Sequence, residues 1–249
     1  MNTGLVSVTF RQLSCEEIIK YACNSGLGYI EWGSDVHVPE TDLENAKRIA
    51  DLTHESGLSV SSYGSYYYLG EGQNFKDYLN TARILKAPVI RVWAGKTASA
   101  AADGYFRNKL AHEAKEIAKQ ASEFNINVDF EYHPNTLTDE HTSARRLLEE
   151  INEPNCRIYW QPNFDLSHEE NLDAINDVLN FVDIVHVFSW EPKFVRLPLS
   201  DRASLWNDYM KILKRKKDIK YLLEFVPDDN PEILKRESET LRNFLKGSN

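Results

Sequence analysis

The chain has 249 residues, 42% of them hydrophobic and 27% charged, with a formal net charge of −9. These values are ordinary for a globular protein, and the acidic balance argues against general nucleic-acid binding, which needs basic patches. No apolar stretch reaches the roughly 20 residues that span a bilayer. Three cysteines without CxxC spacing indicate reduced thiols, and the amino-terminal sequence lacks a signal-peptide pattern. We therefore expect a cytoplasmic protein.

Short β-rich segments alternate with longer helical patterns along the whole chain. Ser14 and Glu17 form a capping-box pattern that predicts the start of the first helix. Asp42, Thr138 and Ser167 are start signals of the same kind for later helices. The eight predicted strands cover residues 6–10, 29–32, 59–65, 89–95, 127–133, 157–163, 183–190 and 221–226.

Eight strand–helix units in a chain of this length match a (β/α)8 TIM barrel. The predicted fold class is therefore α/β, with one TIM-barrel domain over residues 1–249. Several strands are nearly continuous apolar runs, as expected of parallel strands buried on both faces. A doubly wound sheet is the structural alternative, but it binds ligands at one switch point and gives no reason for polar residues after so many strands. The chain also lacks GxGxxG and GxxxxGK[ST] phosphate loops.

Four successive apolar runs in the second half of the chain contain or precede a side chain that can bind a metal ion. They are Glu131 in VDFEYH, Gln161 in RIYWQPN, His186 in DIVHVFSW and Glu224 in YLLEFV. Because a barrel of parallel strands gathers its strand ends at one mouth, we expect these side chains to converge there. Two carboxylates, an amide oxygen and an imidazole balance the charge of one divalent metal ion, which we expect to be Mn, Co, Zn or Mg.

Short motifs at the predicted strand ends carry a family resemblance: TFR (9–11), IEWGSDVH (30–37), RVWAG (91–95), EYH (131–133), YWQPN (159–163), VHV (185–187) and LE (223–224). With these motifs, almost the whole chain resembles the sugar phosphate isomerase/epimerase superfamily, which has a xylose isomerase-like TIM barrel. The resemblance implies that Glu131, Gln161, His186 and Glu224 bind one divalent metal ion. Gln161 stands where the family has an aspartate, which should weaken metal binding. Phe164 stands where some members have a histidine.

The chemistry of that family is proton transfer next to a sugar carbonyl. The resemblance implies that Glu131 and Glu224 act as catalytic acid/base groups on opposite faces of a metal-bound enediolate. We therefore expect a metal-dependent isomerase or epimerase of a sugar, keto-sugar or cyclic polyol, phosphorylated or not. An inosose-type polyol dehydratase begins with the same proton abstraction and stays an alternative, as does a catalytically inactive sugar-binding barrel. An abasic-site endonuclease is disfavoured by the acidic charge and the few histidines at the mouth.

Other side chains at the expected mouth suit a sugar-like ligand. An aromatic ring packs well against the C–H face of a sugar. His133 should share a strand face with Glu131, two positions before it. Arg91 could pair with Glu31 or hold an acidic group of the substrate. We expect a small-molecule sugar or polyol as partner, with no nucleic acid and no membrane, and a homodimer is compatible with the sequence. The predicted substrate contacts are Trp32, His37, Arg91, Trp93 and His133.

Overall fold

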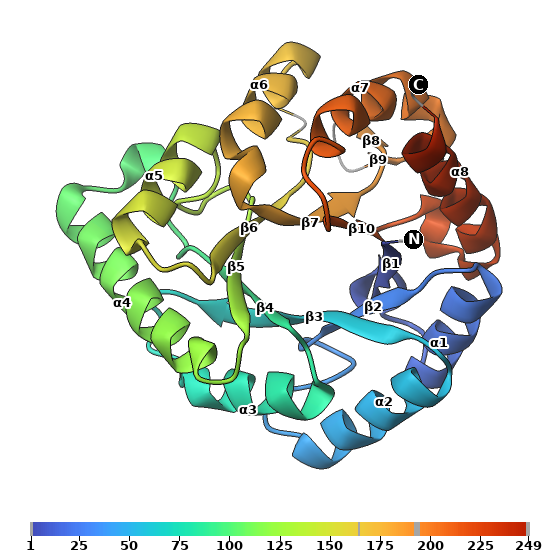
Figure 1. The fold of residues 1–249 in the computed structure, drawn as a ribbon, viewed down its shortest axis with the longest axis horizontal. Helices are drawn as coiled ribbons and strands as arrows, with labels where there is room; N and C mark the ends of the chain where they lie inside the picture. Colours follow the sequence, from blue (N-terminus) through green and yellow to red (C-terminus); the bar gives the residue numbers. More distant parts are fainter. Residues whose placement is uncertain (1, 164, 192–194, 248–249) are drawn as a thin grey trace.

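The computed structural model describes residues 2–163, 165–191 and 195–247, so Phe164 lies outside the described residues. Strands and helices alternate along the chain (Figure 1). The strands are β1 (Thr3–Val6), β2 (Tyr29–Gly33), β3 (Ser59–Tyr68), β4 (Val89–Trp93), β5 (Asn127–Glu131), β6 (Cys156–Trp160), β7 (Val182–Val187), β8 (Trp190–Glu191), β9 (Val195–Arg196) and β10 (Lys220–Leu223). The helices are α1 (Cys15–Asn24), α2 (Leu43–Glu55), α3 (Phe75–Leu85), α4 (Gly104–Ser122), α5 (His141–Ile151), α6 (His168–Val178), α7 (Ala203–Leu213) and α8 (Leu234–Lys246).

Eight strands of the described chain close into a parallel barrel, in the order β1, β10, β7, β6, β5, β4, β3, β2 (Figure 1). β1 closes the ring because it pairs on both sides: Leu5 lies opposite Leu223 of β10 and Ile30 of β2. The predicted (β/α)8 barrel is confirmed, and a doubly wound sheet, which is open, is excluded. The short strands β8 and β9 form a separate antiparallel pair.

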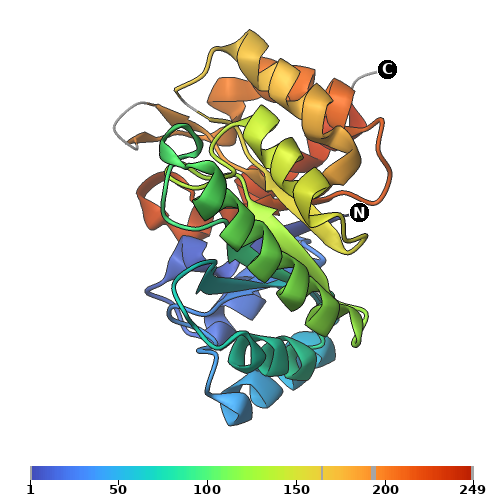
Figure 2. The ribbon, with the colours of Figure 1, turned by 90° about the vertical axis from the view of Figure 1, so that its left-hand side faces the viewer.

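The helices form an outer layer around the barrel, as Figures 1 and 2 show. Their apolar faces and the outer faces of the strands form the main hydrophobic core, in which Ile18 of α1, Ile49 of α2 and Leu147 of α5 are fully buried. Burying one side chain of this size contributes about 1.5–3 kcal/mol. Within the described ranges, every helix is too short or too polar to cross a membrane.

Three predicted helix starts are confirmed by their capping contacts. At α1, Ser14 accepts a hydrogen bond from the Glu17 amide, and the Glu17 carboxylate accepts one from the Ser14 amide. Ser167 and Glu170 form the same reciprocal pair at α6. The Asp42 side chain caps α2. Each cap satisfies backbone amides that have no partner inside the helix, and caps of this kind contribute about 1 kcal/mol.

Several predicted boundaries differ from the structure, and two of these differences affect the loops above the barrel. β1 ends at Val6, the last residue that pairs with β2, and residues 7–10 form a 3-10 helix instead of a strand. α5 begins after Glu140, whose side chain accepts hydrogen bonds from the first backbone amides of the helix. Thr138, the predicted start, instead donates its hydroxyl hydrogen to the Glu131 carbonyl at 2.5 Å. Both deviations shape the loops above the barrel.

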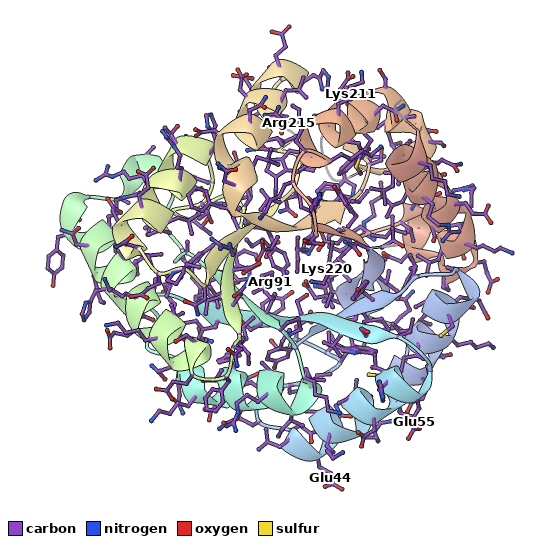
Figure 3. The ribbon with its side chains drawn as sticks, in the orientation of Figure 1. Glu44, Glu55, Arg91, Lys211, Arg215 and Lys220 are labelled. Atoms are coloured by element: carbon purple, nitrogen blue, oxygen red, sulfur yellow. The ribbon has the colours of Figure 1, made fainter. Side chains whose placement is uncertain are left out.

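The inside of the barrel changes from apolar to polar along the strands. Because strand positions two apart share a face, Val89 and Arg91 of β4 point the same way, as do Ile184 and His186 of β7. Val89 and Ile184 belong to a small hydrophobic cluster separate from the main core. Figure 3 shows Arg91 inside the ring of strands. Barrels of this type are mostly filled with branched apolar side chains, so the polar layer marks the mouth as the candidate site.

Asp129 is a buried acid deeper in the barrel. It lies on β5, two residues before Glu131, and it is fully buried. Neither of its carboxylate oxygens has a hydrogen-bond partner among the described residues. Burial, followed by the charge of Asp183, raises the pKa of Asp129 well above its usual value of 3.8. The folded state therefore holds the neutral acid, and ionising it destabilises the fold.

We predict that Asp129→Asn stabilises the protein in a pH-dependent way. The raised pKa means that the folded wild type loses stability as the pH rises from about 3.8 toward the folded-state pKa. At pH 8 the variant should be more stable by on the order of 1–3 kcal/mol, and at pH 4 the difference should be much smaller. Urea unfolding at both pH values measures this. Asp173→Asn, at an exposed position on α6, is the control; an equal effect of both substitutions would contradict the prediction.

Candidate active site at the mouth of the barrel

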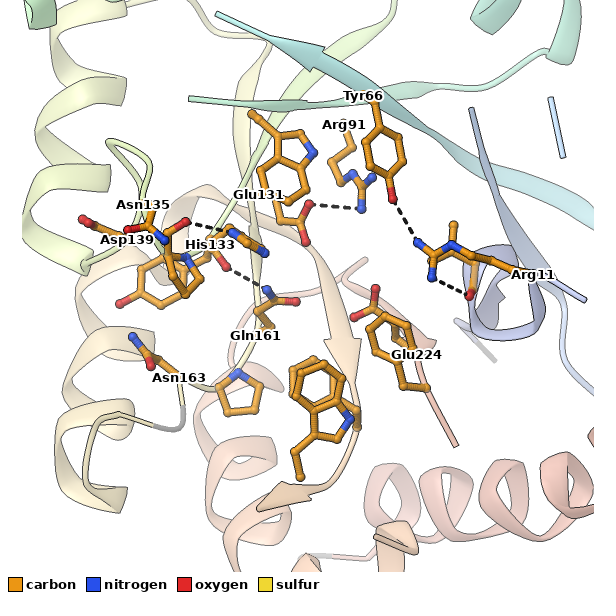
Figure 4. A pocket seen from close by; sticks show the side chains of 18 residues that line it. Arg11, Tyr66, Arg91, Glu131, His133, Asn135, Asp139, Gln161, Asn163 and Glu224 are labelled. Carbon is orange, nitrogen blue, oxygen red and sulfur yellow. Dashed lines mark hydrogen bonds and ion pairs between the residues drawn. The ribbon is translucent and has the colours of Figure 1, made fainter. Parts of the chain in front are cut away.

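A cavity of about 430 Å³ opens at the carboxyl ends of the barrel strands. Trp93 and Glu131 end β4 and β5, and Gln161 and Glu224 directly follow β6 and β10. Figure 4 shows Glu131, Gln161 and Glu224 extending into the same space. The lining residues are Val8, Arg11, Tyr66, Arg91, Trp93, Glu131, Tyr132, His133, Pro134, Asn135, Asp139, Gln161, Pro162, Asn163, Phe188, Trp190, Glu224 and Phe225.

Arg91 is a buried cation on the cavity floor, shared between two carboxylates. Its Nη1 lies 3.1 Å from Glu131 Oε2 and 3.6 Å from Glu31 Oε1. Only 3% of its side chain is exposed. Burial lowers the pKa of Arg91, but Glu131 and Glu31 outweigh burial and raise it above its usual value. Of the two roles that the sequence left open for Arg91, the structure shows the pairing with Glu31 and adds Glu131.

His186 lies beneath the cavity and is fully buried. Its Nδ1 lies 3.4 Å from Glu224 Oε2, and its Nε2 lies 3.6 Å from Glu31 Oε2. Tyr159 packs edge-on against the imidazole, with ring centroids 5.1 Å apart. Burial lowers the pKa of His186, but Glu224 and Glu31 outweigh burial and raise it to about 10. In the metal-free protein, His186 is therefore a second buried cation at neutral pH.

Gln161 brings an amide group to the cavity. Its nitrogen donates a hydrogen bond to the Tyr132 carbonyl at 2.8 Å, which fixes the orientation of the amide. Its oxygen, Oε1, is buried and has no hydrogen-bond partner among the described residues. The same holds for Glu131 Oε2, whose ion pair with Arg91 lacks hydrogen-bond geometry. Buried polar atoms are normally partnered, so these two oxygens are available to a ligand.

An aromatic wall closes one side of the cavity. Trp93 packs against His133, with ring centroids 4.1 Å apart, and against Tyr66 at 6.2 Å. His133 Nδ1 lies 2.9 Å from the carbonyl oxygen of Pro134. Because a carbonyl can only accept, Nδ1 carries the hydrogen, and Nε2 of the neutral ring is an acceptor. His133 and Glu131 line the same cavity, but β5 ends at Glu131 and Tyr132 lines the cavity too, so the predicted strand alternation is not the reason.

The structure does not bring Trp32 and His37 to the cavity. Strand alternation turns Glu31 inward and Trp32 outward, where its indole nitrogen donates to Thr53 of α2 at 3.2 Å. His37 is buried under the loop after β2, with Nε2 3.3 Å from the Leu13 carbonyl. Neither residue lines the cavity, so neither is carried into the proposed function.

Several cavity residues were not singled out as substrate contacts from the sequence. Tyr66 is the clearest case, because the predicted strand stopped at residue 65, whereas β3 continues through Tyr68. Phe225 and Phe188 directly follow strand-end residues that were considered. Asn163 lies in the loop after β6 and was quoted only within a motif. Whether a side chain outside a regular strand lines the cavity depends on the direction in which it points. The hydrophobic periodicity of the sequence does not predict that direction.

Comparison with known proteins places this chain. The family described as "Xylose isomerase-like TIM barrel" matches residues 19–244. The chain belongs to the xylose isomerase-like TIM barrel family. A 3-dehydroshikimate dehydratase from Bacillus anthracis is 24% identical, over 98% of this chain and 97% of that protein.

Solved structures show the same fold. The probable 3-DHS dehydratase AsbF from Bacillus anthracis has a TM-score of 0.78 at 20% identity, covering 98% of this chain and 99% of that one. The 3-keto-D-glucoside 4-epimerase from E. coli has a TM-score of 0.74 at 14% identity, covering 99% and 100%. A barrel protein from Mycobacterium smegmatis in complex with magnesium has a TM-score of 0.68 at 12% identity, covering 95% and 91%. At these identities the structural likeness establishes the fold.

The donor atoms fit the divalent ion that the fold family implies. Glu131 Oε2, Gln161 Oε1 and His186 Nδ1 are buried and have no hydrogen-bond partner among the described residues, and Glu224 lines the cavity with Glu131 and Gln161. His186 Nε2 faces Glu31, and a carboxylate in that position is the usual second partner of a metal-binding histidine. Within the described ranges, no three His, Cys, Asp or Glu side chains are already grouped as a metal site. Gln161, whose side chain is an amide, would add an oxygen donor that is not one of these four residue types.

We predict that Arg91→Gln destabilises the metal-free protein by roughly 3–5 kcal/mol, because it leaves buried carboxylates without their cation. Urea unfolding measures the change. Arg146→Gln is the control, since Arg146 pairs with Glu150 at 2.7 Å but is 63% exposed, and such pairs contribute only about 0–1 kcal/mol. Adding Glu31→Gln to Arg91→Gln should recover part of the loss. A change below about 1 kcal/mol for Arg91→Gln would mean that the buried network does not depend on it.

Proposed function

We propose that this protein transfers a proton next to a carbonyl group of a small hydroxylated substrate, namely a sugar, a keto-sugar or a cyclic polyol. One observation carries the proposal: Glu131 and Glu224 reach one cavity from separate strands of the barrel (Figure 4). Two carboxylates in one cavity can remove a proton from one side of a bound substrate and return it on another. The cavity of about 430 Å³ is in the size range of small-molecule sites.

Each carboxylate has its own cationic partner below the cavity. Arg91 lies 3.1 Å from Glu131, and His186 lies 3.4 Å from Glu224. These contacts place one basic side chain beside each carboxylate, and an ionised carboxylate is the form that can accept a proton. They also restrict where each carboxylate can turn, so that its reacting oxygen stays directed at the cavity. The chain thus positions both bases from beneath.

We propose Glu131, Gln161, His186 and Glu224 as the residues that would hold one divalent ion of the Mn, Co, Zn or Mg type. When bound, such an ion polarises a carbonyl and acidifies the neighbouring C–H. Gln161 contributes an oxygen without charge, so this set carries one negative charge fewer than a set with aspartate. We expect weaker metal binding than an aspartate would give, as the sequence already suggested.

The fate of the abstracted proton distinguishes an epimerase or isomerase from a dehydratase. In epimerisation, one glutamate takes the proton and the other supplies one on the opposite face. In isomerisation, the proton returns to the neighbouring carbon. Tyr66, Trp93 and His133 line the same cavity and offer an aromatic surface and hydrogen-bonding groups to a hydroxylated ring. We propose Arg91, Trp93 and His133 as substrate-side residues of this reaction.

Dehydration is the second candidate reaction. It is favoured by the dehydratase from Bacillus anthracis, which this chain matches over nearly its full length. Dehydration begins with the same proton abstraction and then expels a hydroxyl, which leaves as water if it receives a proton. His133 lines the cavity with Nε2 not used by the Pro134 contact, so a His133 ring that has taken up a proton at Nε2 can give that proton to the leaving hydroxyl. Arg11 at the cavity rim is a cation that a substrate carboxylate could reach.

We predict that Glu131→Gln and Glu224→Gln each lower turnover by roughly 10²–10⁴-fold, because each removes a proton-transfer group. Candidate substrates are ketohexoses, inososes and 3-dehydroshikimate, tested with added Mn²⁺ in D₂O. NMR measures deuterium incorporation next to the carbonyl, and ultraviolet absorbance detects the conjugated product of dehydration. Incorporation without water loss indicates an epimerase or isomerase.

Glu113→Gln is the control for these two variants, since Glu113 binds Tyr67 and Gly70 away from the cavity. It should keep wild-type turnover. If the wild type incorporates no deuterium into any of these substrates and releases no water, the proton-transfer proposal fails. The sugar-binding barrel without catalysis then becomes the reading to pursue, by calorimetric titration with the same compounds.

We predict that Gln161→Asp strengthens Mn²⁺ binding by roughly ten- to hundred-fold, because it adds a charged oxygen to the proposed donor set. Isothermal titration of the metal-free protein measures the affinity. Gln120→Asp, on α4 outside the barrel, adds the same charge away from the cavity and should leave the affinity unchanged. Equal affinities for wild type and Gln161→Asp would show that Gln161 does not bind the metal.

A further inference from the structure

Glu31 is a buried carboxylate that the proposed reaction does not use directly. It lies on β2 inside the barrel, fully buried, and it does not line the cavity. Its Oε2 accepts a hydrogen bond from the Ser62 hydroxyl at 2.8 Å. Its Oε1 has no hydrogen-bond partner among the described residues. A buried charge of this kind is expensive unless it is paired, so its partners indicate what it does.

Glu31 is in contact with Arg91 and His186, the two side chains that lie against the proposed bases. Its Oε1 lies 3.6 Å from Arg91 Nη1, and its Oε2 lies 3.6 Å from His186 Nε2. Arg91 is the residue beneath Glu131, and His186 is the residue beneath Glu224. One carboxylate therefore joins both halves of the cavity floor. Among the described ion pairs, the chain Glu131–Arg91–Glu31–His186–Glu224 is continuous.

The neighbouring strand leaves space for Glu31 at the position where it is needed. A Cβ atom at Gly64 of β3 would lie 2.7 Å from Glu31 Oε1 and 3.3 Å from its Cγ and Cδ atoms. Contacts below 3.0 Å do not occur for real Cβ atoms, so any larger residue at position 64 would displace the Glu31 side chain. Gly64 and Ser62 therefore act together, one by making room and one by donating a hydrogen bond.

We propose that Glu31 is a positioning residue for both proton-transfer groups and acts on them through His186 and Arg91. Facing Nε2 of His186, it keeps Nδ1 directed at Glu224 and the cavity. Facing Arg91, it holds the guanidinium between two carboxylates and so fixes the position at which Glu131 can pair with Arg91. Without the Glu31 charge, the imidazole loses the contact on its inner side and Arg91 has a single carboxylate partner left. This inference rests on the proposed function only in naming Glu131 and Glu224 as the reacting groups.

The test uses Glu31→Gln, which keeps the size of the side chain and removes its charge. NMR spectra of the metal-free protein, labelled with ¹⁵N in histidine and arginine, give the ring N–H signals of His186 and the Nε–H signal of Arg91. Each signal is assigned by its loss in the variant His186→Asn or Arg91→Lys. Glu237→Gln is the matched control. Glu237 is also buried, but it lies on α8, outside the barrel, and accepts a hydrogen bond from the Leu199 amide.

In Glu31→Gln we expect the His186 and Arg91 signals to shift or broaden and their hydrogen exchange to quicken by at least about tenfold. We expect kcat to fall by roughly 10–100-fold, the range for partners one step removed from a reacting or metal-binding group, with KM changed by less than about threefold. Glu237→Gln should leave signals and kcat unchanged. Unchanged His186 and Arg91 signals in folded Glu31→Gln overturn the proposal, whatever happens to the melting temperature.

Two further variants keep the test decisive if Glu31→Gln does not fold. Ser62→Ala removes the hydrogen bond to Glu31, and Gly64→Ala moves its carboxylate, while both retain the charge. Each should disturb the same signals, and unchanged signals in both overturn the proposal. The signals are recorded without substrate or metal. A wild type that lacks activity therefore refutes the proposed function, whereas the NMR signals alone decide whether Glu31 positions His186 and Arg91.

Discussion

Three carboxylates buried at one end of a barrel need basic side chains buried beside them, because an unpaired buried charge is costly. Glu31, Glu131 and Glu224 meet this condition through Arg91 and His186, at distances of 3.1 to 3.6 Å. Burial by itself raises the pKa of Glu31, but His186 and Arg91 outweigh burial and lower it to about 2. The network is costly to desolvate and costly to break. A buried network of this kind beneath a cavity supports the proposal that the mouth of this barrel is a catalytic site.

The barrel supplies this network through strand alternation. Inward positions on β2, β4 and β7 carry Glu31, Arg91 and His186, so residues far apart in the sequence become neighbours. The layer below contains apolar side chains such as Val89 and Ile184, together with the buried acid Asp129. The cavity above is bounded by loops that follow the strands, so substrate specificity can change there without disturbing the charges beneath, as is general for this fold.

Epimerases, isomerases and dehydratases can share such a site because their first step is the same. The reactions differ in the second proton transfer, which delivers a proton either to a carbon atom or to the oxygen of the leaving hydroxyl. Here the two glutamates stand on the floor, and His133 belongs to an aromatic wall with Trp93. Under the proposed function, the position of the substrate between floor and wall would select the outcome. That position would depend on cavity residues such as Tyr66 of β3 and Asn163 of the loop after β6, and fold likeness at low identity carries no information about it.

The sequence by itself determined the fold and most of the cavity floor. Apolar runs at regular intervals, capping residues such as Ser14 and Ser167, and polar residues at strand ends specify a barrel whose mouth gathers Glu131, Gln161 and Glu224. Local patterns can do this because strand alternation and helix capping are local effects. Only the tertiary structure decided that Trp32 faces the helices and that Glu31 links His186 with Arg91. Both contacts depend on the register between strands that are distant in the sequence, and the Glu31 contacts also depend on the space left by Gly64. The residue pattern of a single strand does not predict which side chains of the neighbouring strands lie beside it.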